Sequence, residues 1–347
     1  MLLTLINAAS AKELAVVAMG RFNENLQIKT YFGPFAKKTG VSVTPYSYAG
    51  ELDQIKDMIA AGKTSWDVVE VETPELLRGC KDGLFEKLDY NKIGKHNDFI
   101  PGALSECGVG TYVWSMVIAY DPKQVKDKPT SWSGLWDVKK YPGKRGLLRT
   151  AKYTLEIALL ADGVSPANVY KVLATEDGVD RAFRKLDQIK PYVKWWEAAA
   201  QPPLWLKSGD LAMTAAYSLW IDAAQKQGMD FRMVWNGSLY DIDSWAIVTG
   251  APNKDEAYQF IDFASQPENQ KTFSQNVAYG PTNRKTIDMI DAKRKNQLPR
   301  WGANLKTGIA INGRFWLEHG EELEKRFETW AGPVIRPNVD EDDDMTK

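Results

Sequence analysis

This sequence has few histidines and almost no net charge, and each of these features excludes some classes of function. The two histidines, His96 and His319, show no spacing to other ligand-type residues, so the sequence predicts no metal site. The net charge is −1 over 347 residues, which argues against the clustered basic face that binds nucleic acid. There is no Gly-rich phosphate loop, and no later segment approaches the ~18 apolar residues of a membrane span. We therefore expect no cofactor and no nucleic-acid partner.

Cysteine is also rare, since Cys80 and Cys107 are the whole cysteine content. In an oxidising compartment an even pair indicates a disulfide bond, which would close the loop between the two residues. The alternative is two buried free thiols. The redox state of the compartment therefore matters to this interpretation.

The ends of the chain carry patterns unlike the rest. Residues 2–6 are apolar, and Ala-Ser-Ala at 9–11 fits the small-x-small cleavage pattern before Lys12, although a basic start is missing. We expect residues 1–11 to be a signal-peptide remnant of an exported protein; the alternative is an apolar N-terminal strand. Residues 336–347 contain an acidic run and are expected to form a disordered tail.

Between the ends, short β-rich runs alternate with amphipathic helical stretches. The length favours two lobes, and the βαβαβ opening favours a mostly parallel sheet covered by helices on both faces. The fold class predicted is therefore α/β. Strands are expected at 13–18, 41–47, 66–71, 112–120, 146–148, 213–217, 231–235 and 244–248, and helices at 29–38, 52–61, 155–161, 179–189 and 254–265.

A series of short motifs follows one order along nearly the whole chain, from Lys12 to about Trp330. They are WDVV (66–69), DP (121–122), PTSW (129–132), LWD (135–137), SGD (208–210), DSWAI (243–247), NKD (253–255), FIDF (260–263), PENQ (267–270) and YGPTN (279–283). Each motif alone is weak, but together they resemble the polyamine-binding branch of periplasmic solute-binding proteins, the spermidine/putrescine-binding type.

This resemblance implies a two-lobed periplasmic-binding-protein fold with a hinge and an interlobe ligand cleft. Lobe 1 would comprise residues 12–120 and 248–289, and lobe 2 residues 121–247 and 290–335. It also implies a monomer that captures a small amine-bearing solute in the periplasm and delivers it to the membrane permease of an ABC importer.

The resemblance places a carboxylate and aromatic side chains around the ligand's amine. Asp243 matches the acidic position that holds a primary amine, with a strand-capping turn as the alternative. Tyr217 and Tyr279 match aromatic positions, and Trp220 would wall the cleft or lie buried in a helix. Thirteen tryptophans suit such a site, because cation–π contacts contribute about 0.5–2 kcal/mol each.

The distal end of the site departs from the polyamine pattern. Two acidic positions there fall at Thr150 and Tyr153, with Arg149 adjacent, and Asp241 stands where polyamine binders carry Trp. A guanidinium suits a carboxylate and repels an ammonium. The change favours a short ω-amino acid such as γ-aminobutyrate, although the Asn-Gly-Arg of the γ-aminobutyrate subgroup is missing after Tyr217. Arg149 could instead pair with a surface acid.

Three residues of the first lobe complete the candidate site. Glu72 follows the predicted strand at 66–71, at a position where the family presents a small polar residue to ligand. Met19 and Arg21 lie in the segment after the first strand, which lacks the family's early Trp and gains an Arg. Arg21 is a second candidate partner for a ligand carboxylate.

Two other functional classes compete with transport. An enzyme is disfavoured, because no histidine lies in a nucleophile or metal context and Asp67 and Glu70 have no partner visible in the sequence. A ligand-bearing partner of a sensor or chemoreceptor would need the same binding site, so sequence does not separate it from a transport protein.

Overall fold

The computed structural model describes residues 12–94, 96–299 and 301–333, and this part of the chain divides into two units. The signal-peptide interpretation and the acidic tail lie outside the described residues. The first unit comprises the described residues 12–94 and 96–111, with Ser244–Phe273 and Thr282–Thr286. The second comprises Tyr112–Asp243, Ser274–Pro281 and the described residues 287–299 and 301–333.

The first unit is built on a mostly parallel sheet. Strand β1 pairs in parallel with β2 and β3, and β3 pairs antiparallel with the end of β8, at Val68↔Ile247. The elements of this unit are β1 (Glu13–Met19), α1 (Arg21–Gln27), the π-helical turn Ile28–Phe32, α2 (Gly33–Thr39), β2 (Ser42–Tyr48), α3 (Asp53–Ala60), β3 (Val68–Val71), α4 (Thr73–Lys81), the 3₁₀ turns Tyr90–Lys92 and His96–Asp98, and α11 (Lys254–Ala264).

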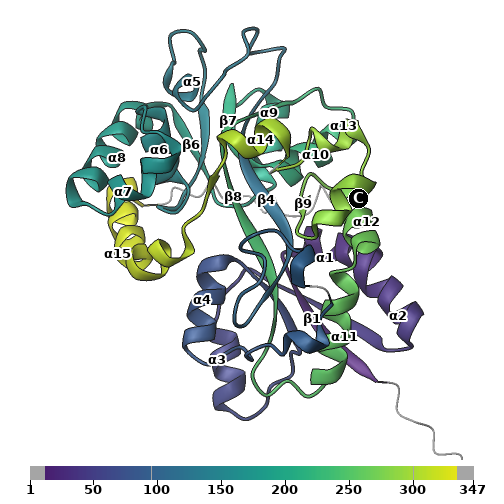
Figure 1. Cartoon of the computed structure of the whole chain (residues 1–347). Helices are drawn as coiled ribbons and strands as arrows, with labels where there is room; N and C mark the ends of the chain where they lie inside the picture. The colour runs from purple at the N-terminus through teal and green to yellow at the C-terminus, as the bar shows by residue number, and fades with distance from the viewer. Residues whose placement is uncertain (1–11, 95, 300, 334–347) are drawn as a thin grey trace, which may run out of the picture. The chain divides into compact units, whose positions relative to one another are not determined.

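Helices cover both faces of this first sheet, as the sequence predicts (Figure 1). Successive strand residues point to opposite faces, and Ala246 packs in the cluster that contains Ile55 of α3 and Leu76 of α4. Trp245, the preceding residue, packs edge-on against Phe260 of α11 at 5.3 Å between ring centroids. After its first residue, Glu13, strand β1 is accordingly an unbroken apolar run, which is typical of a parallel strand buried on both faces.

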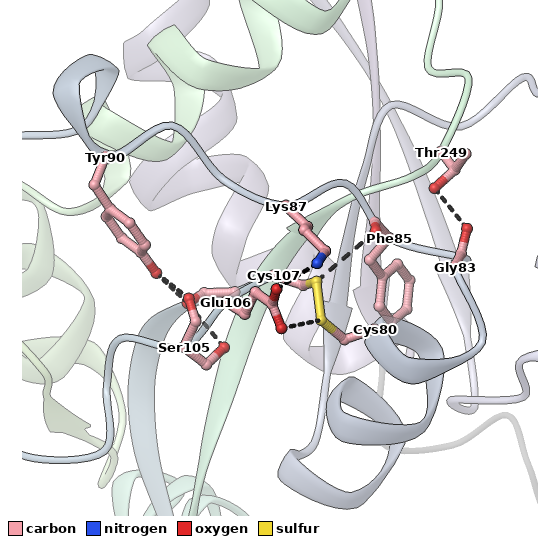
Figure 2. The surroundings of a disulfide bond; sticks show 10 residues. Cys80, Gly83, Phe85, Lys87, Tyr90, Ser105, Glu106, Cys107 and Thr249 are labelled. Carbon is pink, nitrogen blue, oxygen red and sulfur yellow. Dashed lines mark hydrogen bonds and ion pairs between the residues drawn. A yellow bond between two sulfur atoms is a disulfide. The ribbon is translucent and has the colours of Figure 1, made fainter.

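A disulfide bond joins the last turn of α4 to the segment before β4 (Figure 2). Cys80 and Cys107 have Cα atoms 5.8 Å apart, and Cys107 is fully buried. The Phe85 ring packs so close to Gly79 that any side chain at residue 79 would collide with it. An exposed ion pair, Lys87–Glu106 at 2.7 Å, lies beside the bridge. The predicted disulfide is confirmed, and the alternative of two free thiols is wrong.

The second unit has a mixed sheet in the order β4–β7–β5–β6. Strands β4 and β7 pair antiparallel, whereas β7, β5 and β6 run parallel. Its strands are β4 (Val109–Tyr120), β5 (Arg145–Leu148), β6 (Val193–Trp196), β7 (Met213–Tyr217), β8 (Arg232–Ile247), β9 (Gly280–Pro281) and β10 (Ile309–Ala310). Along the chain, β4 and β8 each continue from one unit into the other.

Helices also cover this second sheet. One cluster joins Ala216 of β7 to Leu206 of α9 and Ile221 of α10. On α15, Phe327 packs against Phe183 of α8, and Figure 1 shows α6, α7, α8 and α15 gathered together. The helices of this unit are α5 (Ser133–Trp136), α6 (Thr154–Ala161), the 3₁₀ turn Pro166–Asn168, α7 (Val169–Leu173), α8 (Glu176–Ile189), the 3₁₀ turn Lys190–Tyr192, α9 (Gln201–Ser208), α10 (Ser218–Lys226), α13 (Ala292–Lys295), α14 (Gly302–Thr307) and α15 (Gly313–Ala331). Two further elements, α12 (Pro267–Asn276) and the 3₁₀ turn Arg284–Met289, begin in the first unit and end in the second.

The α/β fold class is confirmed, and two local predictions are wrong. The expected strands at 231–235 and 244–248 are one continuous strand, β8. The helical region expected at 29–38 begins earlier, at Arg21. The units change over at 111/112 and 243/244, several residues before the sequence-based bounds. Within the described residues, no helix combines the length and apolarity needed to cross a bilayer.

Candidate functional site

Asp243 is a buried carboxylate held by two neutral hydrogen-bond donors, all within the second unit. The Tyr112 hydroxyl donates to its Oδ2 and the Trp114 indole Nε1–H to its Oδ1, each at 2.8 Å. Tyr112 and Trp114 are two apart on β4 and so share one face of that strand. Asp243 is 4% exposed. Because both donors are neutral, these bonds orient the carboxylate without cancelling its charge.

Aromatic rings from several elements pack against Tyr112 and Trp114, the two donors to this carboxylate. Tyr279 stacks on Tyr112 with ring centroids 4.8 Å apart. Trp114 makes edge-on contacts with Tyr153, at 5.5 Å, and with Tyr217, at 5.4 Å. A buried carboxylate with aromatic rings packed on its hydrogen-bond donors combines the two groups that bind an ammonium ion, a carboxylate and aromatic rings.

Secondary structure brings these rings together from four distant parts of the chain. Tyr217 ends β7, where it pairs with Met116 of β4. Tyr279 comes directly before β9, whose Pro281 pairs with Tyr112. Tyr153 follows β5 and immediately precedes α6. Of the predicted site residues, the second unit therefore brings Asp243, Tyr217, Tyr279 and Tyr153 together.

The remaining candidates of the second unit have different surroundings. Asp241 shares the Asp243 face of β8, and its Oδ1 accepts a local hydrogen bond from the backbone of Ile242 at 2.8 Å. Trp220 is half-buried in the first turn of α10. Arg149 follows β5 and donates from Nη2 to the carbonyl of Gly332. Within the described residues Arg149 forms no ion pair with a carboxylate, so the expected alternative of a surface acid partner is not seen there.

Met19, Arg21 and Glu72 belong to the first unit. Met19 ends β1, Arg21 is exposed at the start of α1, and Glu72 directly precedes α4. Arg21 opens the first turn of a helix, and Gly20, with a φ of 72°, makes the turn between β1 and this helix.

The two acids without a visible sequence partner also lie in the first unit, and both are hydrogen-bonded. Asp67 accepts from the backbone N–H groups of Ala15 and Asn253, each at 2.8 Å. Glu70 accepts from the side-chain amides of Asn23 and Gln27. These bonds tie strands to helices. Among the described residues, no group of three or more acids, histidines or cysteines is placed to hold a metal ion.

Sequence reasoning missed three aromatic residues of the site. Tyr112 and Trp114 lie in a strand whose apolar pattern predicts core, and only their alternate spacing marks one shared face. Trp196 of β6 packs edge-on against Tyr217 at 5.8 Å. Its buried indole N–H has no hydrogen-bond partner among the described residues.

A buried carboxyl fixes α6, the helix that follows Tyr153. The Oε1 of Glu156 accepts from the Tyr170 hydroxyl at 2.8 Å and from the Trp316 indole N–H at 2.7 Å. Burial raises the pKa of Glu156 from 4.5 to about 7. Below pH ~4.5 the folded and unfolded states are both protonated. As the pH rises to ~7 the unfolded state loses its proton first, so the free energy of unfolding falls.

We expect Glu156→Gln to remove this pH dependence. Relative to the variant, the wild type should lose up to about 3 kcal/mol of unfolding free energy between pH 4.5 and pH 8. Urea unfolding of both proteins at the two pH values measures the difference. An equal difference at both pH values would contradict the raised pKa. The comparison cancels the other titrating groups, because the two proteins share them.

In sequence and in fold, the chain is similar to several known proteins. A family model described as bacterial extracellular solute-binding protein matches residues 30–300. The γ-aminobutyric acid-binding protein of Pseudomonas aeruginosa is 52% identical over 93% of this chain and 92% of its own length. The spermidine/putrescine-binding periplasmic protein of Escherichia coli is 23% identical over 72% of each chain. An ABC transporter substrate-binding protein from Bradyrhizobium japonicum superposes with a TM-score of 0.85 at 34% identity, over 92% of this chain and 99% of that one.

Proposed function

The chain belongs to the bacterial extracellular solute-binding proteins, and from this premise we propose that it captures a short ω-amino acid such as γ-aminobutyrate. The observation that carries the proposal is the buried Asp243 carboxylate, oriented by two neutral aromatic donors on which further aromatic rings pack. An ammonium group placed there would gain a charged hydrogen bond, about 1.5–3 kcal/mol, and cation–π contacts. The Pseudomonas relative supports γ-aminobutyrate as the first ligand to test.

The opposite end of the ligand is a carboxylate in this proposal, with Arg149 or Arg21 as its partner. One of the five N–H groups of Arg149 donates to Gly332, and a guanidinium can bind a carboxylate through two of the others. A diamine would need a second carboxylate instead, for which Asp241 and Glu72 are the candidates. The choice between a carboxylate and a second amine therefore decides the substrate class.

We propose that the protein works as a monomer in the periplasm and passes its ligand to the permease of an ABC importer. The family and the substrate-binding protein from Bradyrhizobium support this role. A role beside a sensor would use the same capture step. Uptake of labelled ligand in a strain lacking the permease separates the two roles, since transport would stop and sensing would continue.

We expect a thermal-shift panel on ligand-free protein to give shifts with γ-aminobutyrate and 5-aminovalerate. A ligand at 100 times its Kd adds about 2.7 kcal/mol to the unfolding free energy, which raises Tm by several degrees. Butyrate and n-butylamine are matched controls, because each keeps one charged end and should give almost no shift. Putrescine, spermidine and arginine complete the panel. A shift with diamines alone would overturn the ω-amino acid proposal and implicate Asp241 or Glu72.

A further inference from the structure

The segment between β5 and α6 carries an unusual backbone conformation beside the candidate site. Tyr153 has φ 74° and ψ −44°, and it is the one non-glycine residue with positive φ in the part of the chain described here. Such a conformation is energetically costly for any residue other than glycine, and it persists only where the surrounding structure enforces it. The Tyr153 ring contacts Trp114, which donates to Asp243. The backbone at residue 153 therefore sets one wall of the site.

A carboxylate from the C-terminal helix holds the two residues before Tyr153. Glu324 of α15 accepts from the Ala151 N–H through Oε2, at 2.8 Å, and from the Lys152 N–H through Oε1, at 3.0 Å. The Thr150 hydroxyl donates to the Lys152 carbonyl at 2.6 Å. These bonds fix the peptide groups that precede Tyr153, and on its other side the Tyr153 carbonyl accepts from the Ile157 N–H of α6 at 2.9 Å. The change of chain direction therefore falls on Tyr153.

The same helix contacts this stretch at two further points. Trp316, near the start of α15, donates to Glu156 at 2.7 Å, three residues beyond Tyr153. Gly332, which follows the end of α15, accepts from the Arg149 side chain, four residues before Tyr153. A helix of 19 residues is about 28 Å long and rigid, so it can brace both sides of Tyr153 at once.

We propose that α15 positions the ligand site, and that Glu324 is a positioning residue that sets ligand affinity through the backbone of Ala151 and Lys152 and the ring of Tyr153. Glu324 needs no contact with the ligand for this effect. The inference rests on the proposed function for its ligand, but its geometric part concerns the free protein. The test therefore needs one readout with ligand and one without.

With ligand, we expect Glu324→Ala to weaken binding of γ-aminobutyrate by about tenfold in isothermal titration calorimetry, since two charge-assisted hydrogen bonds are lost. In a Tyr153→Ala background the same change should cost less than about twofold, because the ring through which it acts is gone. Equal losses in the two backgrounds would overturn the positioning role. Glu321→Gln is the matched control, since Glu321 is an exposed acid on the same helix.

Without ligand, the ¹⁹F resonance of Tyr153 reports its position in protein labelled with 3-fluorotyrosine, where Tyr153→Phe identifies the signal. We expect Glu324→Ala to shift this resonance and Glu321→Gln to leave it in place. An unmoved resonance in Glu324→Ala would overturn the inference. A wild-type protein that binds no ω-amino acid would overturn the proposed function, while the ¹⁹F result would still decide the role of Glu324.

Discussion

Replacing Asp243 with Asn should weaken binding of an amine-bearing ligand at least 100-fold, which corresponds to about 2.7 kcal/mol. Removing one member of a buried, hydrogen-bonded charge pair typically costs 2–5 kcal/mol. The amide also fits its own surroundings poorly. Tyr112 and Trp114 both donate to this side chain, and an amide NH₂ group cannot accept a hydrogen bond. Isothermal titration calorimetry with the ligand that gives the largest thermal shift measures the loss.

Asp230→Asn is the matched control, because Asp230 is an exposed aspartate paired with an exposed Arg232. We expect this variant to bind as the wild type does. Circular dichroism and Tm of free Asp243→Asn should show a folded protein, so that lost binding is not lost structure. Unchanged affinity in folded Asp243→Asn would remove Asp243 from the site. Asp241→Asn adds a second comparison: a loss as large as that of Asp243→Asn would favour a diamine over an ω-amino acid.

The fold was predictable where the local pattern and the tertiary structure agree. Helix α6 follows from an apolar run that ends at the turn signal Asp162-Gly163, and strand β7 at 213–217 follows from an apolar run that begins after Gly209-Asp210. Strand β8 was not predictable as one strand, because Asn236-Gly237 is a turn signal in the sequence. Gly237 does adopt a positive φ of 73°, but the strand continues. Its carbonyl accepts from Trp132, and Leu239 pairs with Ile309 of β10. Long-range pairing overrides the local signal.

Helix α1 is an element that the hydrophobic pattern does not predict at all. Residues 21–27 are mostly polar, so apolar periodicity gives no helix there. In the structure Asn23 and Gln27 are buried and donate to Glu70 of β3. A buried polar contact between elements far apart in the sequence leaves no local periodic trace. The helix therefore becomes visible only when its partner strand is in place.

The residues of the candidate site also differ in whether the sequence alone indicates them. Asp243, Tyr217 and Tyr279 could be proposed from the sequence because they lie in motifs shared with a known family, although Asp243 lies inside β8 and not at a strand end. Tyr112 and Trp114 could not, since an aromatic residue in an apolar strand has the same sequence signature whether it packs in a core or donates to a carboxylate. Only the pairing of β4 with β9 and the hydrogen bonds to Asp243 reveal their role.

Removing the disulfide in Cys80→Ser/Cys107→Ser should lower the unfolding free energy by about 3–4 kcal/mol. The bridge closes a loop of 27 residues, and the loop-closure entropy of the unfolded chain predicts a loss of this size. For a domain of 150–250 residues this loss lowers Tm by about 7–14 °C. Cys107 is fully buried against a core that includes Phe85 and Leu76, so serine at this position adds a polar group to an apolar cluster. Differential scanning calorimetry measures the shift.

Dithiothreitol separates the effect of the bridge from the effect of serine. Wild-type protein heated with reductant should approach the Tm of the double variant, whereas the double variant should not respond to reductant. Any residual gap between the reduced wild type and the variant measures the cost of burying a hydroxyl in place of the Cys107 sulfur, rather than the bridge itself. A wild-type Tm that is the same with and without reductant, at full reduction of both thiols, would contradict a stabilising role of the bridge. The surrounding core of the first unit would then be sufficient without it.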